Sequence, residues 1–356
     1  MDPITHLMTG AVLARTGFNR KAAYATLAMT LAAEAPDLDV LWTIRGPIAA
    51  FQHHRGWTHT LIGLPLEAGV VVGAVWLLHR WRLKRSRSTK QVAPIRWGLL
   101  YVFALIALLS HLLLDWTNNY GLRPFFPFNP RWYDGSLVFI IEPVMLAVLL
   151  IALLAPPLFG LINSEVGVRK VAFRGRGWAI AAIVAIVTLW GWRTVEQQKA
   201  IQLALNGDYG GIANNTQILR VTAEPFPINP FRWEAIIETP DFYQFAAIDT
   251  FNGTVATNEH ADVFYKPSTT LATLVAKRSW LGEVYLDWSK LPLITQTNID
   301  PVTGETTVTF RDLRFMYDTP FTHDREDPEG PPLSGKVILN ADRRITRMEM
   351  DGHIQH

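Results

Sequence analysis

Four long apolar stretches constrain the fold of this chain more than any other feature of its sequence. They lie at roughly residues 61–79, 97–115, 138–162 and 178–195. Each can cross about 30 Å of hydrocarbon, since a helix rises about 1.5 Å per residue. We predict that all four are transmembrane helices. The composition agrees, because 49% of residues are hydrophobic and only 18% are charged, which excludes a disordered chain.

The segment before these stretches has a different pattern. Its apolar runs, at about residues 7–14 and 22–33, are each too short to span and are interrupted by Arg15, Arg20 and Lys21. We predict a helical hairpin that dips into the membrane without crossing it. The first residues lack the basic region and cleavage site of a signal peptide, so we expect insertion to depend on the helices themselves.

Lysine and arginine are unevenly distributed among the loops, and this asymmetry predicts orientation. Two loops are rich in them and should be cytoplasmic: they carry Arg80, Arg82, Lys84, Arg85, Arg87, Lys90 and Arg96, and Arg169, Lys170, Arg174 and Arg176. Residues 34–60 and 116–137 contain two each. We therefore predict that these two segments, and everything after the last span, face the outside of the cell.

Beyond about residue 200 the pattern changes to short β-prone runs separated by turn signals. The runs lie at 217–222, 233–239, 242–248, 283–288, 306–310 and 336–340. We predict a multi-domain protein: an α-helical polytopic membrane domain at 1–200, followed by a mostly antiparallel β domain outside the cytoplasm at 201–356.

Charge and cysteine content narrow the chemistry. A formal net charge of +2 gives no strongly basic surface, so we expect no nucleic-acid partner. With no cysteine, metal ligands must come from histidine, carboxylates and water. The sequence also lacks His-Glu-x-x-His, Gly-x-Ser-x-Gly and P-loop motifs, which argues against one class of metalloprotease, serine hydrolysis and conventional nucleotide hydrolysis.

Three carboxylates follow the second apolar run of the N-terminal segment: Glu34, Asp37 and Asp39. Acidic residues at a helix C-terminus oppose the helix dipole, so helix stability does not explain them. They indicate either a metal-binding cluster or a solvated turn after Pro36.

Histidines concentrate just before the first full span. His53, His54 and His59 lie within seven residues, and a turn at Gly56 would let His54 and His59 converge on a metal. The alternative is that they lie at the lipid headgroups together with Trp57.

His111 and Asp115 occupy positions i and i+4 of the second span, on one face near its predicted outer end. Ionisable residues inside a span are costly and by default functional. The alternative is a polar pair that joins two helices. His6 belongs to the same group if the hairpin begins on the outer side.

In combination, these motifs resemble the bacterial membrane-bound metal-dependent hydrolases, the YdjM-like, LexA-regulated inner-membrane hydrolases. The resemblance covers residues 1 to about 200 and rests on Asp2-x-x-Thr5-His6-x-x-x-Gly10, Pro36-Asp37-x-Asp39, His54-Arg55-Gly56-x-Thr58-His59, His111-x-x-x-Asp115 and Asn118-Asn119-Tyr120-Gly121. The stretch 225–233 is similar to the start of the outer domain of longer members. Glu142 departs from the pattern, where the family favours Asp.

The resemblance implies a helical membrane domain with a divalent metal centre, expected to hold zinc. By position, the implied ligands are His6, Asp37, Asp39, His54, His59, His111 and Asp115. A fainter similarity to zinc-dependent phospholipase C suggests phosphoester cleavage.

We therefore expect a hydrolase with two or three metal ions, bridged by Asp37 or Asp115, at the outer face of the bacterial inner membrane. Asp39 or Glu34 would accept a proton, and the substrate would be a membrane lipid such as a lipid phosphate. The alternative is a non-enzymatic, metal-stabilised scaffold whose outer domain binds an envelope partner. A transporter is a weaker hypothesis, because the polar groups cluster at one face and not at the midplane.

Overall fold

The chain forms two compact units in the computed structural model. The helical unit comprises Met1–Asp39, Arg55–Val195 and Phe226–Pro230, and the β unit comprises Val40–His54, Glu196–Pro225 and Phe231–His356. The structure describes residues 1–85, 93–165, 175–209, 216–257, 262–297, 299–316, 318–319, 322–323 and 331–356. The domain boundary expected after residue 200 thus falls after Val195. In addition, Val40–His54 belongs to the β unit and Phe226–Pro230 to the helical unit.

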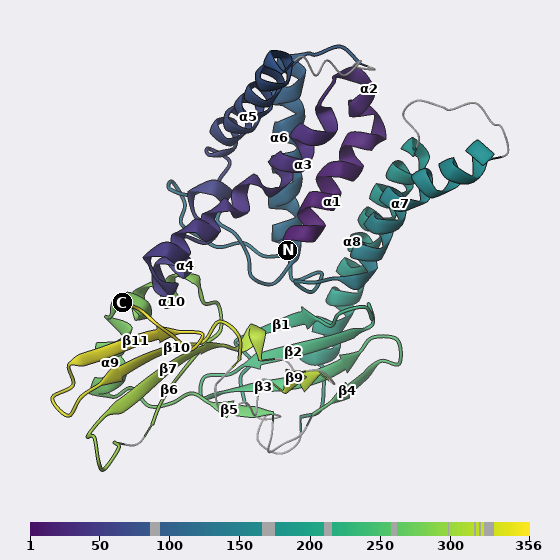
Figure 1. The fold of residues 1–356 in the computed structure, drawn as a ribbon. Helices are drawn as coiled ribbons and strands as arrows, with labels where there is room; N and C mark the ends of the chain where they lie inside the picture. Colours follow the sequence, from purple (N-terminus) through teal and green to yellow (C-terminus); the bar gives the residue numbers. More distant parts are fainter. Residues whose placement is uncertain are drawn as a thin grey trace. The chain divides into compact units, whose positions relative to one another are not determined.

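The helical unit begins with two short helices that pack against each other. They are α1 (Pro3–Leu13) and α3 (Ala25–Glu34), and between them lie η1 (Ala14–Phe18) and α2 (Asn19–Lys21). Asp2 caps α1 by accepting a hydrogen bond from the Thr5 backbone N–H at 2.9 Å. Figure 1 labels α1, α2 and α3 at the N-terminal end of the chain.

Gly10 allows these two helices to approach closely. A Cβ atom at this position would lie 2.5 Å from the Met29 carbonyl oxygen and 2.7 Å from the Ala33 Cβ, both on α3. Any larger residue would force the helices apart. The close contact fixes the C-terminal end of α3 against α1, and the segment η2 (Ala35–Arg45) follows directly after α3.

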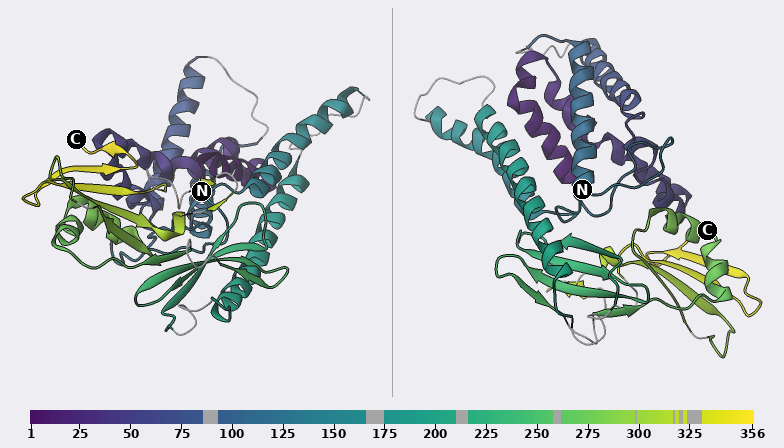
Figure 2. Two further views of the ribbon diagram at one scale, coloured as in Figure 1. Left: turned by 90° about the horizontal axis from the view of Figure 1, so that it is seen from below. Right: turned by 180° about the vertical axis from the view of Figure 1, so that it is seen from behind.

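The longer helices of the chain are α5 (Leu64–Lys84), α6 (Trp97–Thr117), α7 (Pro143–Glu165) and α8 (Arg176–Leu205). Helix α6 packs against both α3 and α5, as the view from behind in Figure 2 shows. The short η3 (Trp57–His59) precedes α5.

Two helices, α6 and α8, are long and apolar enough to span a membrane by themselves. A third span is reached only if Pro47–His59 and Leu64–Lys84 count together as one broken or re-entrant segment. The stretch predicted at 138–162 begins at Pro143, and its described apolar part ends at Phe159, short of a full span. The described residues thus support two or three spans, and the fourth stays a prediction. Of the predicted cytoplasmic loops, Arg87, Lys90, Arg169, Lys170 and Arg174 lie outside those residues.

The β unit contains two five-stranded antiparallel sheets, which confirms the predicted strand type. One sheet has the order β1-β2-β3-β4, with β5 also paired to β3: Arg220–Pro225, Arg232–Glu238, Phe242–Asp249, Thr254–Ala256 and Val263–Tyr265. The other has the order β12-β11-β10-β7-β6: His353–Ile354, Ile345–Met350, Gly335–Leu339, Thr306–Asp312 and Pro292–Gln296. A small hairpin pairs β8 (Asp318–Thr319) with β9 (Thr322–His323).

Three short helices, α4 (Pro47–His53), α9 (Leu271–Lys277) and α10 (Trp280–Trp288), also belong to the β unit, as does the turn η4 (Leu313–Phe315). The strand predicted at 283–288 is wrong, because these residues form the second half of α10. The Ser279 hydroxyl accepts from the Gly282 N–H at 3.0 Å and starts a helix there.

Candidate metal centre

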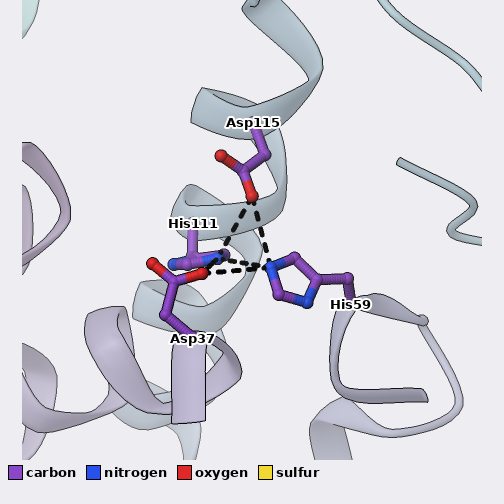
Figure 3. Close-up of side chains that lie close together, drawn as sticks. All are labelled: Asp37, His59, His111 and Asp115. Atoms are coloured by element: carbon purple, nitrogen blue, oxygen red, sulfur yellow. Dashed lines mark hydrogen bonds and ion pairs between the residues drawn. The ribbon is translucent and has the colours of Figure 1, made fainter. Parts of the chain in front are cut away.

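Four side chains of the helical unit converge on one point: Asp37 of η2, His59 of η3, and His111 and Asp115 of α6. Each offers one ligand atom, and the four atoms lie within 4.8 Å of one another. Figure 3 shows the two imidazoles and two carboxylates directed toward a common centre. The sequence predicted all four residues as metal ligands.

The distances between the ligand atoms fit a small divalent cation. The two Nε2 atoms of His59 and His111 are 3.0 Å apart, and each lies 3.3 Å from Asp115 Oδ2. Asp37 Oδ1 lies 3.4 Å from His59 Nε2 and 3.6 Å from His111 Nε2. With metal–ligand bonds of about 2.1 Å, the donor atoms of a tetrahedral site are about 3.4 Å apart. Two imidazole nitrogens and two carboxylate oxygens form a donor set suited to zinc and similar ions.

Each histidine ring is oriented by a second contact. His111 Nδ1 donates a hydrogen bond to the carbonyl oxygen of Ala33 at 2.7 Å. That carbonyl belongs to the last turn of α3, where helix carbonyls lack an intrahelical partner. His59 Nδ1 lies 3.0 Å from Thr58 Oγ1 and 3.5 Å from Asp39 Oδ2. Such outer contacts fix the tautomer and leave Nε2 as the ligand atom.

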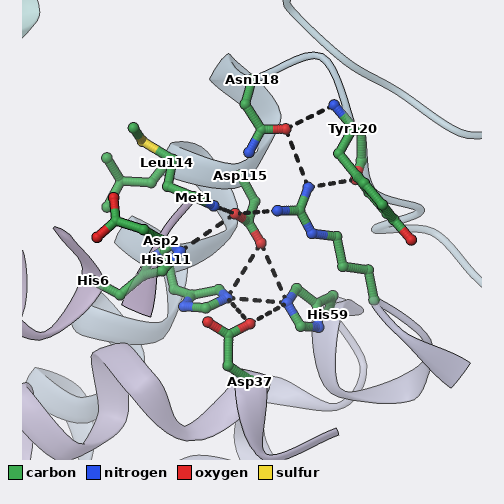
Figure 4. A network of polar contacts seen from close by, with 12 residues as sticks. Met1, Asp2, His6, Asp37, His59, His111, Leu114, Asp115, Asn118 and Tyr120 are labelled. Atoms are coloured by element: carbon green, nitrogen blue, oxygen red, sulfur yellow. Dashed lines mark hydrogen bonds and ion pairs between the residues drawn. The ribbon is translucent and has the colours of Figure 1, made fainter. Parts of the chain in front are cut away.

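The two oxygens of Asp115 have different environments. Oδ2 faces the two histidines and makes no hydrogen bond. Oδ1 accepts a hydrogen bond from the Arg55 guanidinium at 2.7 Å, lies 3.3 Å from His6 Nε2, and contacts the amino group of Met1. Figure 4 shows Met1 and His6 at one oxygen of Asp115, and His59 and His111 at the other.

Arg55 is a member of the centre that sequence reasoning missed. Its side chain is buried and also donates to the Gly121 carbonyl oxygen at 2.8 Å, while its backbone N–H donates to Asp39 Oδ2 at 2.7 Å. The ring of Tyr120 lies against the guanidinium, 4.7 Å from it. Its position between two predicted ligands, His54 and His59, could have indicated that it belongs to the centre. From the sequence, Arg55 counted only as one of the positive residues per loop and as part of the family motif.

The other predicted ligands lie outside the group of four. His6 is buried beside it, with its ring stacked on His111 at 3.8 Å and neither ring nitrogen in a hydrogen bond. Asp39 lies behind His59, as described above. His54 belongs to the β unit, and its assignment as a ligand stays a prediction. Glu142, where the sequence departs from the family pattern, forms an ion pair with Arg193 at 3.0 Å and has no place in the group.

The charges around the centre shift the pKa values of groups outside the spans. Burial opposes ionisation of Asp37, but the hydrogen bond to His59 and the charge of His111 hold its pKa well below the usual value. Burial and the nearby Asp37 and Asp2 carboxylates raise the pKa of Glu34 to about 7. Burial, the N-terminal ammonium and His111 lower the pKa of His6 to about 3.

Comparisons with known proteins place the N-terminal part of the chain in a family. A curated relative from Bacillus subtilis (strain 168), described as "Uncharacterized protein YfhP", is 24% identical over 151 residues. That region is 40% of this chain and 42% of the relative, so the match spans less than half of either protein. No solved structure matches the chain. The model of the YdjM inner membrane protein family matches residues 1–200, which include every residue of the group of four and both helices of the N-terminal segment. Because this match covers more than half of the 356 residues, the chain belongs to the YdjM inner membrane protein family.

Proposed function

We propose that this membrane protein is a metal-dependent hydrolase whose cation is held by Asp37, His59, His111 and Asp115. The observation that carries the proposal is the convergence of four donor atoms, from three separate elements, at the spacing of a tetrahedral site. Asp115 Oδ2 is a buried carboxylate oxygen that lies 3.3 Å from both Nε2 atoms, and burial of its charge without a positive partner is costly. A bound cation removes that cost.

Access to the centre is from the side of Asp37. The side chains of His59, His111 and Asp115 are 0% exposed, whereas that of Asp37 is 17% exposed. Glu34, three residues before Asp37, ends α3 with its Oε2 buried and without a hydrogen bond. We assign Glu34 the role of proton acceptor, because Asp39 is already engaged by the Arg55 N–H and lies at His59 Nδ1.

A divalent cation bound here would acidify a water molecule and offset the negative charge on the oxygens of a substrate. Residues of the protein would hold the cation, orient its ligands and accept the proton. Asp37 and Asp115 neutralise the cation, and Ala33 and Asp39 hold the two imidazoles in their ligating orientation. Glu34 takes the proton that hydrolysis releases.

The substrate we propose is a membrane lipid phosphate, at the outer face of the bacterial inner membrane. The loop that carries His59 exposes Trp57 and Leu61, and the Leu61 N–H donates to the Pro124 carbonyl oxygen at 2.9 Å. The loop after Pro124 exposes Phe125 and Phe128. Aromatic and aliphatic side chains of this kind suit the membrane interface, where a lipid headgroup would lie close to the centre. The outward orientation rests on the lysine and arginine asymmetry of the loops.

One observation favours the second candidate, a metal-stabilised scaffold whose β unit binds an envelope partner. Four protein donors saturate a tetrahedral ion, whereas catalysis needs an open position for water. A hydrolase of this design must therefore hold its cation with five or six ligands, one or two of which, respectively, are water.

Coordination number and turnover together separate the two candidates. The protein would be loaded with cobalt in detergent, because four-coordinate cobalt absorbs visible light far more strongly than five- or six-coordinate cobalt. Hydrolysis of bis(p-nitrophenyl) phosphate and of a phosphatidic acid would be measured on the same samples. Weak absorption with turnover supports the hydrolase. Strong absorption with no turnover on either substrate favours the scaffold.

A further inference from the structure

The carboxylate of Asp115 raises the question of how many cations the centre holds. In a centre with two ions, a bridging carboxylate binds one cation through each oxygen. Here Oδ2 faces His59 and His111 at 3.3 Å, while Oδ1 accepts from the Arg55 guanidinium at 2.7 Å and also contacts the Met1 amino group. One oxygen is therefore free for a metal, and the other already has a cation of the protein.

Arg55 is held in this position by the fold. Its side chain is 4% exposed, and it donates to the Asn118 side-chain oxygen at 3.3 Å and to the Gly121 carbonyl oxygen at 2.8 Å. Its backbone has a positive φ of 53°, which a non-glycine residue adopts only when its surroundings enforce it. The guanidinium carries a permanent positive charge. A second divalent cation on Oδ1 would lie next to this charge in a buried site, where repulsion is weakly screened.

The donors left for a second ion are few. His6 Nε2, 3.3 Å from Oδ1, is the imidazole nitrogen nearest to that oxygen in the contacts described above. Within the part of the chain that the structure describes, the one group of three or more candidate ligands is Asp37, His59, His111 and Asp115. His6 and Oδ1 alone would make a two-ligand site beside a fixed positive charge.

We propose that the centre holds a single cation and that Arg55 takes the place of a second one, as the positioning residue of Asp115. By binding Oδ1, the guanidinium directs Oδ2 to the metal and prevents a second metal ion from binding to Oδ1. This inference rests on the proposed function for the presence of the first ion. It differs from the two or three ions expected from the sequence.

Zinc stoichiometry tests the inference. The full chain in detergent would be equilibrated with excess zinc alone, passed through a desalting column and analysed for zinc and protein. Wild type should hold one zinc per chain, and Arg55→Lys, which keeps the charge, should also hold one. Arg55→Gln should hold two, because Oδ1 then loses the guanidinium, while His6 Nε2 stays 3.3 Å from it. The double variant Arg55→Gln, His6→Ala should return to one, which controls for zinc bound elsewhere on the surface.

Two zinc ions in wild type would overturn this inference and leave the proposed function standing. No zinc in wild type would overturn both. A folded Arg55→Gln variant that still holds one ion would show that Arg55 does not set the metal count. If Arg55→Gln fails to fold, the decision rests on wild type and Arg55→Lys: one ion in each supports the inference, and two in either overturns it.

Discussion

The Nε2 atoms of His59 and His111 face each other at 3.0 Å in the interior of the helical unit, although the two residues are 52 positions apart in the sequence. A single hydrogen can lie between two neutral imidazole nitrogens, and the carboxylate oxygen of Asp115 lies 3.3 Å from both. Lone pairs directed to one point in this way are satisfied together by a cation. This pair is therefore the geometric core of the proposed centre.

Asp115→Asn should abolish hydrolysis with little change in fold. The amide is nearly the same size as the carboxylate and its oxygen can still accept from Arg55, but it lacks the negative charge that holds the cation. Because turnover depends on accurate placement of the reacting groups, we expect a loss of about 100-fold or more. Turnover of a phosphodiester would be compared at matched thermal stability. Near-normal turnover in the variant would exclude Asp115 as a ligand of a catalytic cation.

Asp39→Asn should weaken the centre without destroying it. Asp39 Oδ2 lies 3.5 Å from His59 Nδ1 and accepts the Arg55 N–H, so it orients both residues without belonging to the group of four. Loss of such an outer carboxylate typically lowers metal affinity by about 10- to 100-fold. Zinc titration against a competing chelator measures the effect. If the ion is lost completely, Asp39 is a direct ligand, as the resemblance implied.

Glu34→Gln should lower turnover by about 100-fold or more and leave zinc content unchanged. A general base typically contributes about 10²- to 10⁴-fold, and glutamine cannot accept the proton. Zinc analysis and phosphodiester turnover on the same sample separate the two effects. Full activity in the variant would remove Glu34 from the mechanism.

The ion pair of Asp312 and Arg314 should make the β unit sensitive to acid. Burial opposes ionisation of Asp312, but Arg314 and the Ser289 hydroxyl hold its pKa at about 2. The unfolded carboxyl titrates near 3.9, so the stabilisation is complete above about pH 4 and is lost as the pH falls toward 2. A shift of this size corresponds to about 2–3 kcal/mol of stability. Hydrogen exchange of β7 peptides from pH 5 to 2.5 should show this loss in wild type and not in Asp312→Asn, whereas the exposed Asp241→Asn should behave as wild type.

The topology prediction can be tested cleanly, because the chain contains no cysteine. Single cysteines at the exposed positions Phe128 and Thr303 should react with an impermeant maleimide in intact cells, and a cysteine at Arg85 should not. This expectation rests on the uneven distribution of lysine and arginine among the loops, which predicts their orientation. Labelling of position 85 from outside would place the centre at the cytoplasmic face.

Sequence patterns predicted the residues of the centre better than their roles. The i, i+4 spacing of His111 and Asp115 puts both on one helical face whatever the tertiary fold, so their proximity could be predicted. Asp37 and Asp39 are two residues apart, and which of them ligates depends on how η2 leaves α3. That geometry depends on the close approach at Gly10 and on the Ala33 carbonyl, neither of which local periodicity encodes.

Two further features could not be predicted for physical reasons. Arg55 looks like a solvated loop cation in the sequence, and only the fold reveals the carboxylate and carbonyl groups that stabilise its burial. The run at 283–288 reads as a strand because its aromatic and branched residues favour β-structure. The cap at Ser279 and the buried positions Leu281, Tyr285 and Trp288, with helical spacing, override that preference.

Elemental analysis of purified wild type, His59→Ala and His353→Ala tests the central claim most directly. His353 lies exposed in β12, so its loss controls for the removal of a histidine. The account predicts a stoichiometric divalent metal in wild type and His353→Ala, and a loss of about tenfold or more in His59→Ala. Equal metal content in all three proteins, or no metal in any, would contradict a cation site at Asp37, His59, His111 and Asp115.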